Sequence, residues 1–141
     1  MFEIRYVSAR DKPFWFALDG HLNANEFDLK IRDRRGYVIC DSGKPVGVMR
    51  YNLFWDSIPF LTLIYIEEAF RGKGLGKNAV QYWENEMRES GYPMTMTSTQ
   101  ADEQAQQFYR SLGYRDAGCL VLDKPPYAQP LEIFLTKYIN T

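Results

Sequence analysis

An apolar strand pattern that runs into a turn with three alternate glycines, and then into a helix pattern, constrains this chain more than any other feature. The apolar run covers residues 63–66, and the amphipathic stripe covers residues 74–89. The glycines are Gly72, Gly74 and Gly76, and the cations beside them are Arg71, Lys73 and Lys77. Because glycine has no Cβ atom, such a turn allows positive φ angles and lets backbone N–H groups converge on an anion where a helix starts. The segment therefore predicts a site for phosphate or pyrophosphate.

Other glycine-rich patterns fit this turn less well. A Walker-type loop needs glycine at position 71 and serine or threonine at position 78, where the chain has Arg71 and Asn78. A dinucleotide-binding fingerprint that starts at Gly72 needs glycine at position 77, which is Lys77, and it belongs to an early βαβ unit. A plain turn with surface lysines and no ligand is the remaining alternative, although three glycines cost entropy that an ordinary connection does not require.

The rest of the chain alternates between strand and helix patterns, without a repeat or an interdomain linker. Predicted strands cover residues 2–7, 37–40, 46–54, 60–66, 93–99, 114–122 and 131–139. Predicted helices cover residues 74–89 and 101–112, and residues 13–35 form one or two further helices broken near residues 20–25. Turn-rich separators between the second, third and fourth strands favour an antiparallel meander. A length of 141 residues fits one domain over residues 1–141.

Charge and composition argue against several classes of partner. Lys and Arg number 17 against 18 Asp and Glu, and the formal net charge of -1 argues against nucleic acid or an anionic membrane as a partner. The chain contains no stretch as long as a membrane span, and its start lacks the apolar region of a signal peptide, so the expected location is the cytoplasm. Cys40 and Cys119 lack Cys-x-x-Cys spacing and have apolar neighbours, which predicts two reduced core residues and no metal site.

Two motifs give the chain a family resemblance. Residues 71–76, Arg-Gly-Lys-Gly-Leu-Gly, resemble the Arg/Gln-x-x-Gly-x-Gly/Ala acyl-CoA motif of the GNAT N-acetyltransferase superfamily, and residues 63–66 resemble its fourth strand. Residues 105–114 resemble its later Ala-x-x-Phe-Tyr-x-x-x-Gly-Phe/Tyr segment, in which a helix leads into a strand. The resemblance implies an α/β (α+β) fold with a mixed, largely antiparallel sheet of about six to seven strands flanked by about four helices.

The resemblance also implies acetyl-CoA as the cosubstrate. By similarity, backbone amides of the glycine turn would hold its pyrophosphate, with Arg71 at the start of the same loop. These amides belong to Gly72, Lys73, Gly74, Leu75, Gly76 and Lys77. The pantetheine arm would hydrogen-bond the backbone around Tyr65 and Ile66, at the end of the preceding strand.

Tyr109 is the general acid that the resemblance implies. Many family members use a tyrosine at this position to protonate the departing CoA thiolate, and a phenol with an ordinary pKa near 10 carries its proton at neutral pH. The acceptor would be a primary amine of a small molecule or peptide, which attacks directly in a ternary complex. Two alternatives stay open: Tyr109 merely packs with Phe108 against the sheet, or the protein is a non-catalytic acyl-CoA-binding regulatory module.

A general base is also needed, because the amine must lose a proton before or during its attack. Glu67 directly follows the fourth-strand pattern and is the candidate, although Glu67 and Glu68 can equally form a solvated pair that balances the basic loop. Asp56 and Asp102 are further carboxylates near the expected cleft. Asp102 is first interpreted as the N-cap of the helix over residues 101–112.

The acceptor site has weaker signals. Trp15, Phe16, Phe54 and Trp55 come from segments that flank the acceptor site in the family, but ordinary core packing explains most of them equally well. The lone His21 lies in a helix connection, which favours a surface or structural role over that of a base. The identity of the amine and the formation of a homodimer are left open.

Overall fold

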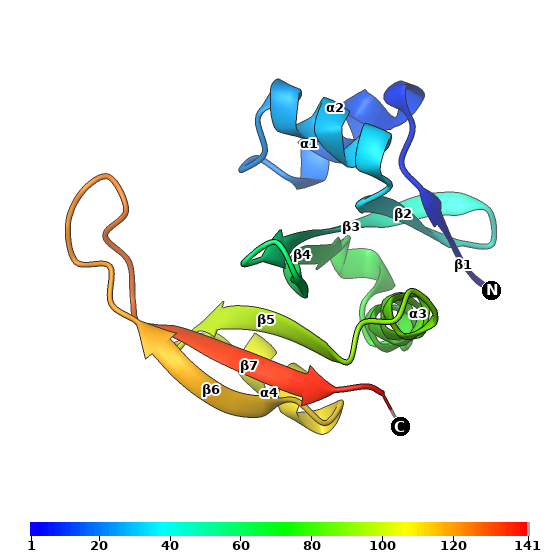
Figure 1. Cartoon of the computed structure of the whole chain (residues 1–141). Coiled ribbons are helices and arrows are strands. Elements are labelled where there is room, and N and C mark those ends of the chain that lie inside the picture. The colour runs from blue at the N-terminus through cyan, green and yellow to red at the C-terminus, as the bar shows by residue number, and fades with distance from the viewer. Residues whose placement is uncertain (141) are drawn as a thin grey trace. The chain divides into compact units, whose positions relative to one another are not determined.

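A computed structural model describes residues 1–140, and Figure 1 labels its elements. The strands are β1 (Phe2–Tyr6), β2 (Gly36–Asp41), β3 (Lys44–Phe54), β4 (Ile58–Ile66), β5 (Met94–Gln100), β6 (Arg115–Leu120) and β7 (Glu132–Tyr138). The α-helices are α1 (Lys12–Leu18), α2 (Ala24–Asp33), α3 (Leu75–Glu89) and α4 (Ala105–Ser111), and the short 3₁₀ helices are η1 (Ala9–Asp11) and η2 (Glu68–Phe70). The chain forms two compact units, the first from residues 1–52 and 62–83, the second from residues 53–61 and the chain from residue 84 onward.

Backbone hydrogen bonds join the strands in the order β1-β2-β3-β4-β5-β7-β6. The β4–β5 pair is parallel, whereas β1–β2, β2–β3, β5–β7 and β6–β7 are antiparallel. Together with the four α-helices of residues 1–140, this confirms the mixed, largely antiparallel sheet predicted from the family resemblance.

Local signals position the two helices at the start of the first unit. Pro13 lies in the first turn of α1, where its missing N–H costs no hydrogen bond. Asn23 caps α2, because its side-chain oxygen accepts from the Glu26 N–H at 2.8 Å. The helix ends at Arg34, which has a left-handed φ of 56°. Two helices with a break near residues 20–25 are therefore confirmed.

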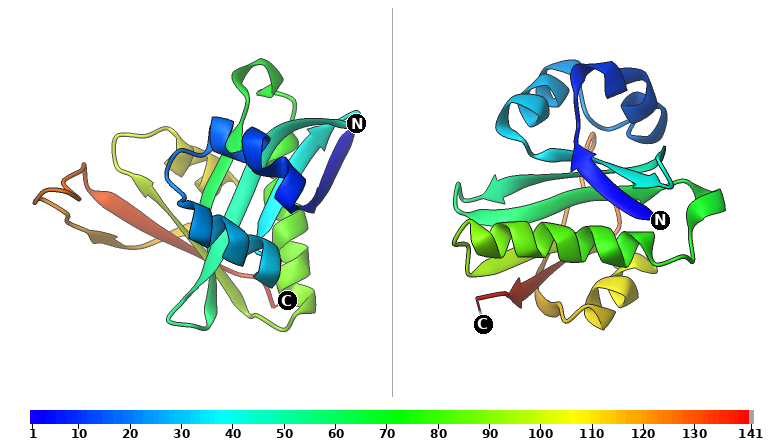
Figure 2. Two further views of the ribbon diagram at one scale, coloured as in Figure 1. Left: turned by 90° about the horizontal axis from the view of Figure 1, so that it is seen from above. Right: turned by 90° about the vertical axis from the view of Figure 1, so that its right-hand side faces the viewer.

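The strands of the first unit pack on both faces. Figure 2 shows α1 and α2 on one side of β1, β2 and β3. The core on this side consists of Val7, Trp15, Phe27, Val38, Cys40 and Val48. Alternation along the strands sends other side chains the opposite way, where Tyr37 contacts Tyr82 of α3 and Tyr51 contacts Trp83 of the same helix.

The predicted apolar stripe of α3 is confirmed. All of its members are buried, namely Leu75, Ala79, Val80, Trp83 and Met87. The chain turns after the helix at Gly91, whose φ is 91° and whose N–H donates to the Arg88 carbonyl. Within residues 1–140, no helix has the length and apolar character needed to cross a membrane.

Strand β5 organises the second unit. It pairs with β7 along its whole length, and β7 pairs with β6 on its other side. Phe60 and Leu61, at the second-unit end of β4, lie opposite Met96 and Thr97 in the parallel pair. Because alternate residues of a strand point to opposite faces, this register sends Thr95, Thr97 and Thr99 to one side.

Two expectations in the second unit are wrong. The helix predicted over residues 101–112 begins only at Ala105, because residues after β5 first form turns and the Ala101 N–H donates to the Leu131 carbonyl at 2.7 Å. Cys119 is exposed, whereas Cys40 is buried as predicted. The reason is that Cys119 lies in β6, the last strand in the sheet order, and all residues of that strand are exposed.

Candidate functional site

The end of β4, which leads into the glycine turn, is held closely by β3 in the first unit. The Glu67 N–H donates to the Val46 carbonyl at 2.8 Å. A Cβ atom added to Gly47 would lie 2.8 Å from the Tyr65 carbonyl oxygen, so only glycine lets the two strands approach this closely. Tyr65 and Ile66, the predicted pantetheine contacts, are thus fixed from one side by β3.

The side chain of Arg71 folds back onto the end of β4. Its Nε donates to the Ile66 carbonyl at 2.8 Å, and its guanidinium carbon lies 5.1 Å from the centre of the Tyr65 ring. These contacts tie the start of the glycine turn to the strand before it. They give Arg71 a structural role that the motif alone does not indicate.

The glycine turn opens directly onto the N-terminus of α3. Gly72 and Gly74 have φ angles of 78° and 81°, and the Asn78 N–H donates to the Gly74 carbonyl at 3.0 Å. The N–H groups of residues 75–77 belong to the first helical turn, where a helix supplies no carbonyl partner. A Cβ at Gly72 or Gly74 would meet no atom within 4 Å, so the φ angles and not lack of space require glycine. Free amides and open space together suit an anion.

Lysine side chains surround Phe70, just before the turn. The Nζ atoms of Lys73 and Lys44 lie 5.1 Å and 5.0 Å from the centre of its ring. Lys73 also lies 3.9 Å from the Asp41 carboxylate. Two ammonium groups beside one carboxylate leave local positive charge near the turn, which favours an anionic ligand.

The two glutamates before the turn differ in exposure. Glu67 is half-buried at the end of β4, and Glu68 is exposed in η2. In the part of the chain that the structure describes, neither forms an ion pair with Arg71 or Lys73, and the carboxylate beside Lys73 is that of Asp41. The pair therefore does not balance the basic loop through direct contacts, and the base role of Glu67 stays a prediction.

Tyr109, in the second unit, is buried with only 5% of its surface exposed. Its ring packs edge-on against Phe108 and Tyr114, with centres 5.2 Å and 5.6 Å apart. Burial raises the pKa of the phenol to about 12, although a hydrogen bond with the Thr97 side chain acts in the opposite direction. Tyr109 therefore packs with Phe108, as one interpretation predicts.

A row of buried threonines on β5 faces this region of the second unit. Thr95, Thr97 and Thr99 are 0%, 1% and 6% exposed. The Thr95 hydroxyl lies 2.9 Å from the Tyr114 hydroxyl, and the Thr97 hydroxyl donates to the Leu61 carbonyl at 2.9 Å. The Thr99 hydroxyl has no partner among residues 1–140. This row was not identified from the sequence, although threonine at every second position of a predicted strand indicates a row of hydroxyl groups on one face.

The N-cap prediction for Asp102 is wrong. Helix α4 starts later, after Gln104, so Asp102 lies in the preceding turn. Glu103 acts in its place as the residue that closes this turn, because its carboxylate accepts from the Gln100 N–H at 2.8 Å. The reason is that residues 101–104 form a turn, in which the Ala101 N–H donates to the Leu131 carbonyl, before the helix begins.

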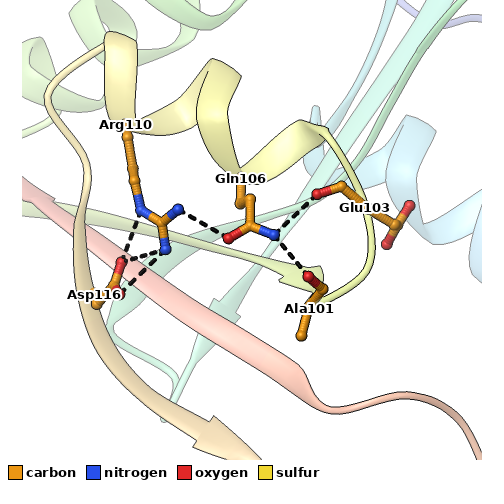
Figure 3. Close-up of polar contacts among 5 residues, drawn as sticks. All are labelled: Ala101, Glu103, Gln106, Arg110 and Asp116. Carbon is orange, nitrogen blue, oxygen red and sulfur yellow. Dashed lines mark hydrogen bonds and ion pairs between the residues drawn. The ribbon is translucent and has the colours of Figure 1, made fainter.

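Gln106 and Arg110 continue this turn into α4 (Figure 3). The Gln106 amide donates to the carbonyls of Ala101 and Glu103 at 2.8 Å and 3.0 Å, and its oxygen accepts from Arg110 at 2.8 Å. Arg110 also pairs with the Asp116 carboxylate at 2.9 Å. The chain of contacts fixes the helix that carries Tyr109.

The candidates near the start of the chain are core or surface residues. Trp15 is fully buried, and its Nε1 donates to the Asp19 carboxylate at 3.1 Å. Phe16 packs against the same core. His21 is exposed, as predicted, and its backbone N–H donates to Asp19 at 3.1 Å. Trp15 is thus a core residue.

The turn between β3 and β4 presents an aromatic side chain to solvent. Trp55 and Asp56 both adopt left-handed φ angles, 54° and 57°, and Trp55 is 79% exposed. Phe54 contacts Trp55 and Phe60, with ring centres 4.8 Å and 6.2 Å apart. Core packing therefore does not explain Trp55.

Comparisons with known proteins place this geometry in a family. The family model described as the acetyltransferase (GNAT) family matches residues 3–114. A comparison with curated proteins finds no match.

Solved structures show the same fold at low sequence identity. The ribosomal-protein-S18-alanine N-acetyltransferase of Escherichia coli is 18% identical with a TM-score of 0.81, covering 100% of this chain and 96% of that one. Ard1 of Thermoplasma volcanium is 17% identical with a TM-score of 0.84, covering 98% and 97%. A GNAT family acetyltransferase from Elizabethkingia anophelis with acetyl-CoA bound is 14% identical with a TM-score of 0.78, covering 97% of each chain. With the family model over most of its length, this chain belongs to the acetyltransferase (GNAT) family.

Proposed function

We propose that this protein is an acetyl-CoA-dependent N-acetyltransferase that transfers the acetyl group to a primary amine of a small molecule or peptide by direct attack in a ternary complex. The observation that carries the proposal is the turn in which Gly72 and Gly74 take positive φ angles and lead into the N-terminus of α3. Membership of the acetyltransferase family supports the reaction type. Both cysteines are free, as is usual in the reducing cytoplasm, which we propose as the location.

The glycine turn suits the pyrophosphate of acetyl-CoA. The N–H groups of residues 72–77 would donate to phosphate oxygens, and the dipole of α3 would favour their charge. Lys73 and Lys77 add positive charge from exposed positions. Because Arg71 occupies the Ile66 carbonyl, we assign the pantetheine contacts to the other backbone groups of Tyr65 and Ile66. The acetyl-CoA complex of the Elizabethkingia relative supports this cosubstrate.

Tyr109 is the proposed general acid. Attack of the amine on the thioester breaks the C–S bond, and the departing thiolate takes the proton of the phenol. The pKa of Tyr109 is raised to about 12. A thiol has an ordinary pKa of about 8.5, so transfer of the phenol proton to the thiolate is uphill. The phenol keeps its proton at neutral pH as predicted, but any group that stabilises the phenolate would lower this barrier.

Glu67 is the proposed general base, which removes a proton from the attacking amine. It directly follows Ile66 in the chain, next to the backbone assigned to pantetheine, and the residue is half-buried. Glu67→Gln keeps the shape of the side chain and removes its basicity, and it is expected to lower kcat. The matched control Glu68→Gln changes an exposed neighbour and is expected to leave kcat unchanged. Full turnover by Glu67→Gln would eliminate the base role.

Release of free CoA from acetyl-CoA, measured over a panel of amines, tests the reaction. The panel contains polyamines, aminoglycosides and peptides with free N-termini. Peptides that begin with alanine are included because one similar structure is a ribosomal-protein-S18-alanine N-acetyltransferase. Peptides that begin with Met-Val are included because another is Arabidopsis thaliana Naa50 in complex with the bisubstrate analogue CoA-Ac-MVNAL. Release with at least one acceptor is expected. Tight binding of acetyl-CoA without release for any acceptor would favour a non-catalytic regulatory module.

Tyr109→Phe tests the acid separately from binding. It is expected to lower kcat by about 10²-fold or more, with acetyl-CoA binding unchanged. Tyr114→Phe is the matched control, since it removes another buried phenol, one bonded to Thr95 at 2.9 Å. The control is expected to retain turnover. Full activity of Tyr109→Phe would rule out the acid role.

A further inference from the structure

The hydroxyl of Thr99, in the second unit, is buried without a hydrogen-bond partner. The residue is 6% exposed, and its Oγ1 atom forms no hydrogen bond with any of residues 1–140. A buried hydroxyl that is left unpaired lowers stability, because it has lost its bonds to water. Such a group is rare in a folded protein and needs an explanation, and a ligand that bonds it is one.

The two other threonines of β5 already have partners. Because β5 pairs with β7 in continuous register, alternation sends Thr95, Thr97 and Thr99 to the same side of the strand. The Thr95 hydroxyl lies 2.9 Å from that of Tyr114, and the Thr97 hydroxyl donates to the Leu61 carbonyl at 2.9 Å. Within the described part of the chain, Thr99 thus has the one hydroxyl of this row that is free to bond a ligand.

The same face of β5 carries the proposed acid. The ring of Tyr114, whose hydroxyl bonds Thr95, lies 5.6 Å from the ring of Tyr109. Helix α4, which holds Tyr109, contacts β5. If Tyr109 protonates the sulfur of CoA, the part of CoA next to the sulfur approaches this face of the strand. Thr99 belongs to the same face, so its hydroxyl is placed to meet that part of the cosubstrate.

The pantetheine arm, which ends at the sulfur, suits a buried hydroxyl. The arm is uncharged, and an ethylene group joins its nearest amide to the sulfur. A threonine hydroxyl both donates and accepts, and an amide offers a carbonyl oxygen and an N–H that match both functions. A phosphate would instead bring ionic charge to a buried site, which is costly without a paired charge. The free hydroxyl therefore favours the arm over the pyrophosphate.

We propose that the Thr99 hydroxyl hydrogen-bonds the amide nearest the sulfur in the pantetheine arm of acetyl-CoA. The inference rests on the proposed function, and it adds a side chain of the second unit to the backbone groups of Tyr65 and Ile66. CoA and acetyl-CoA carry the same amide, so the bond contributes equally to the affinity for both. Loss of the hydroxyl weakens the binding of both compounds. It leaves the free protein no less stable, since the free protein makes no bond with this hydroxyl.

Three variants of the full chain test the proposal by isothermal titration calorimetry and thermal unfolding. Thr99→Val removes the hydroxyl at similar volume. Its dissociation constants for CoA and acetyl-CoA are expected to rise about three- to tenfold, while the melting temperature without ligand stays the same or rises. Thr99→Ser keeps the hydroxyl and is expected to bind both compounds within about twofold of the wild type. The matched control Thr95→Val removes the bond to Tyr114 and is expected to show the opposite pattern, a lower melting temperature with dissociation constants near those of the wild type.

Unchanged dissociation constants in Thr99→Val would overturn the proposal. A melting temperature that falls as far as in Thr95→Val would also overturn it, because the hydroxyl would then bond the free protein or a bound water. Weaker binding of acetyl-CoA alone would overturn the assignment to the amide. If Thr99→Val does not fold, Thr99→Ala, which also lacks the hydroxyl, replaces it in the binding measurement.

Failure of the proposed function has a different signature. A wild-type protein that binds acetyl-CoA, loses affinity in Thr99→Val and releases no CoA with any amine would contradict catalysis and leave the contact of Thr99 standing. A wild-type protein that releases CoA with an amine, beside unchanged binding in Thr99→Val, would overturn this contact alone.

Discussion

The phenol of Tyr109 holds its proton over an unusually wide range of pH. Burial raises its pKa to about 12, so the acid form is complete throughout the range in which the protein can be assayed. The amine acceptor, in contrast, gains nucleophilicity as it loses its proton. We expect kcat at saturating acetyl-CoA to rise with pH to a plateau and to show no alkaline decline up to about pH 10.

This profile is measured beside that of Tyr109→Phe. The variant is expected to lie below the wild type by a constant factor across the plateau, because the missing proton donor is fully protonated in the wild type at each of these pH values. A decline of the wild type near pH 9 that Tyr109→Phe lacks would contradict the raised pKa.

Asp11 stabilises the first unit at neutral pH, and this stabilisation is expected to be lost in acid. Its carboxylate accepts from both terminal nitrogens of Arg5 at 2.8 Å and from the Ser8 N–H at 2.8 Å. These bonds, first of all that of Arg5, lower its pKa from 3.8 to about 2. Because the folded pKa is the lower one, the stabilisation is complete above about pH 4 and is lost as pH falls towards 2.

Asp11→Asn is therefore expected to lower the free energy of unfolding by about 1–2 kcal/mol at pH 7. This value already includes a reduction for screening by solvent, because Arg5 is 44% exposed. Urea unfolding at pH 7 and at pH 2 measures the difference, which should nearly vanish at the lower pH. Asp33→Asn removes the exposed ion pair with Arg32 and is the control that should change stability far less. An equal effect of Asp11→Asn at both pH values would contradict the pKa shift.

At the scale of residues, the motif residues could be predicted from sequence and their partners could not. The positive φ angles of Gly72 and Gly74 could be expected, because glycine adopts this conformation without the steric cost of a Cβ atom. The bond between Arg71 and the Ile66 carbonyl depends on how the side chain turns back, which no spacing encodes. The bond between Thr97 and the Leu61 carbonyl joins residues far apart in the sequence, so the pattern of β5 alone does not predict it.

At the scale of elements, patterns predicted the type of each helix and strand, and errors arose where a neighbouring strand decides the boundary. The stripe of α3 needs only periodicity, so it was found almost to the residue. The start of α4 depends on β5 and on the bond from Ala101 to Leu131, a contact distant in sequence. The exposure of β6, with Cys119, depends on its last place in the sheet order, which the strand pattern alone does not contain.

The glycine turn is the element whose geometry is easiest to test. Gly74→Ala places a Cβ in open space but in a left-handed conformation, and it is expected to cost about 1–2 kcal/mol of stability. Relief of this strain would turn the amides at the start of α3, so KM for acetyl-CoA should rise while kcat changes little. Thermal unfolding and steady-state kinetics measure the two effects. Gly20→Ala, also in open space but without a positive φ, is the control that should leave both unchanged, and an unchanged KM in Gly74→Ala would contradict the anion site.

At the scale of the whole molecule, the two compact units are interleaved along the chain. The first takes residues 1–52 and 62–83, so neither unit is one continuous stretch. The division falls inside β3, β4 and α3, each of which has residues in both units. Unfolding one unit alone would therefore break two strands and a helix in mid-length. The single domain over residues 1–141 stays a prediction.

Hydrogen exchange under native conditions tests this cooperativity. The amides of Ile39 in β2 and Leu135 in β7 report on different units, and both residues are fully buried. If the chain opens as one domain, both amides exchange with the same free energy of opening. Acetyl-CoA at about a hundred times its dissociation constant should then raise both values by the same amount, about 2.7 kcal/mol. Protection that rises at Ile39 alone would mean that the units open independently and that the ligand stabilises only the unit with the glycine turn.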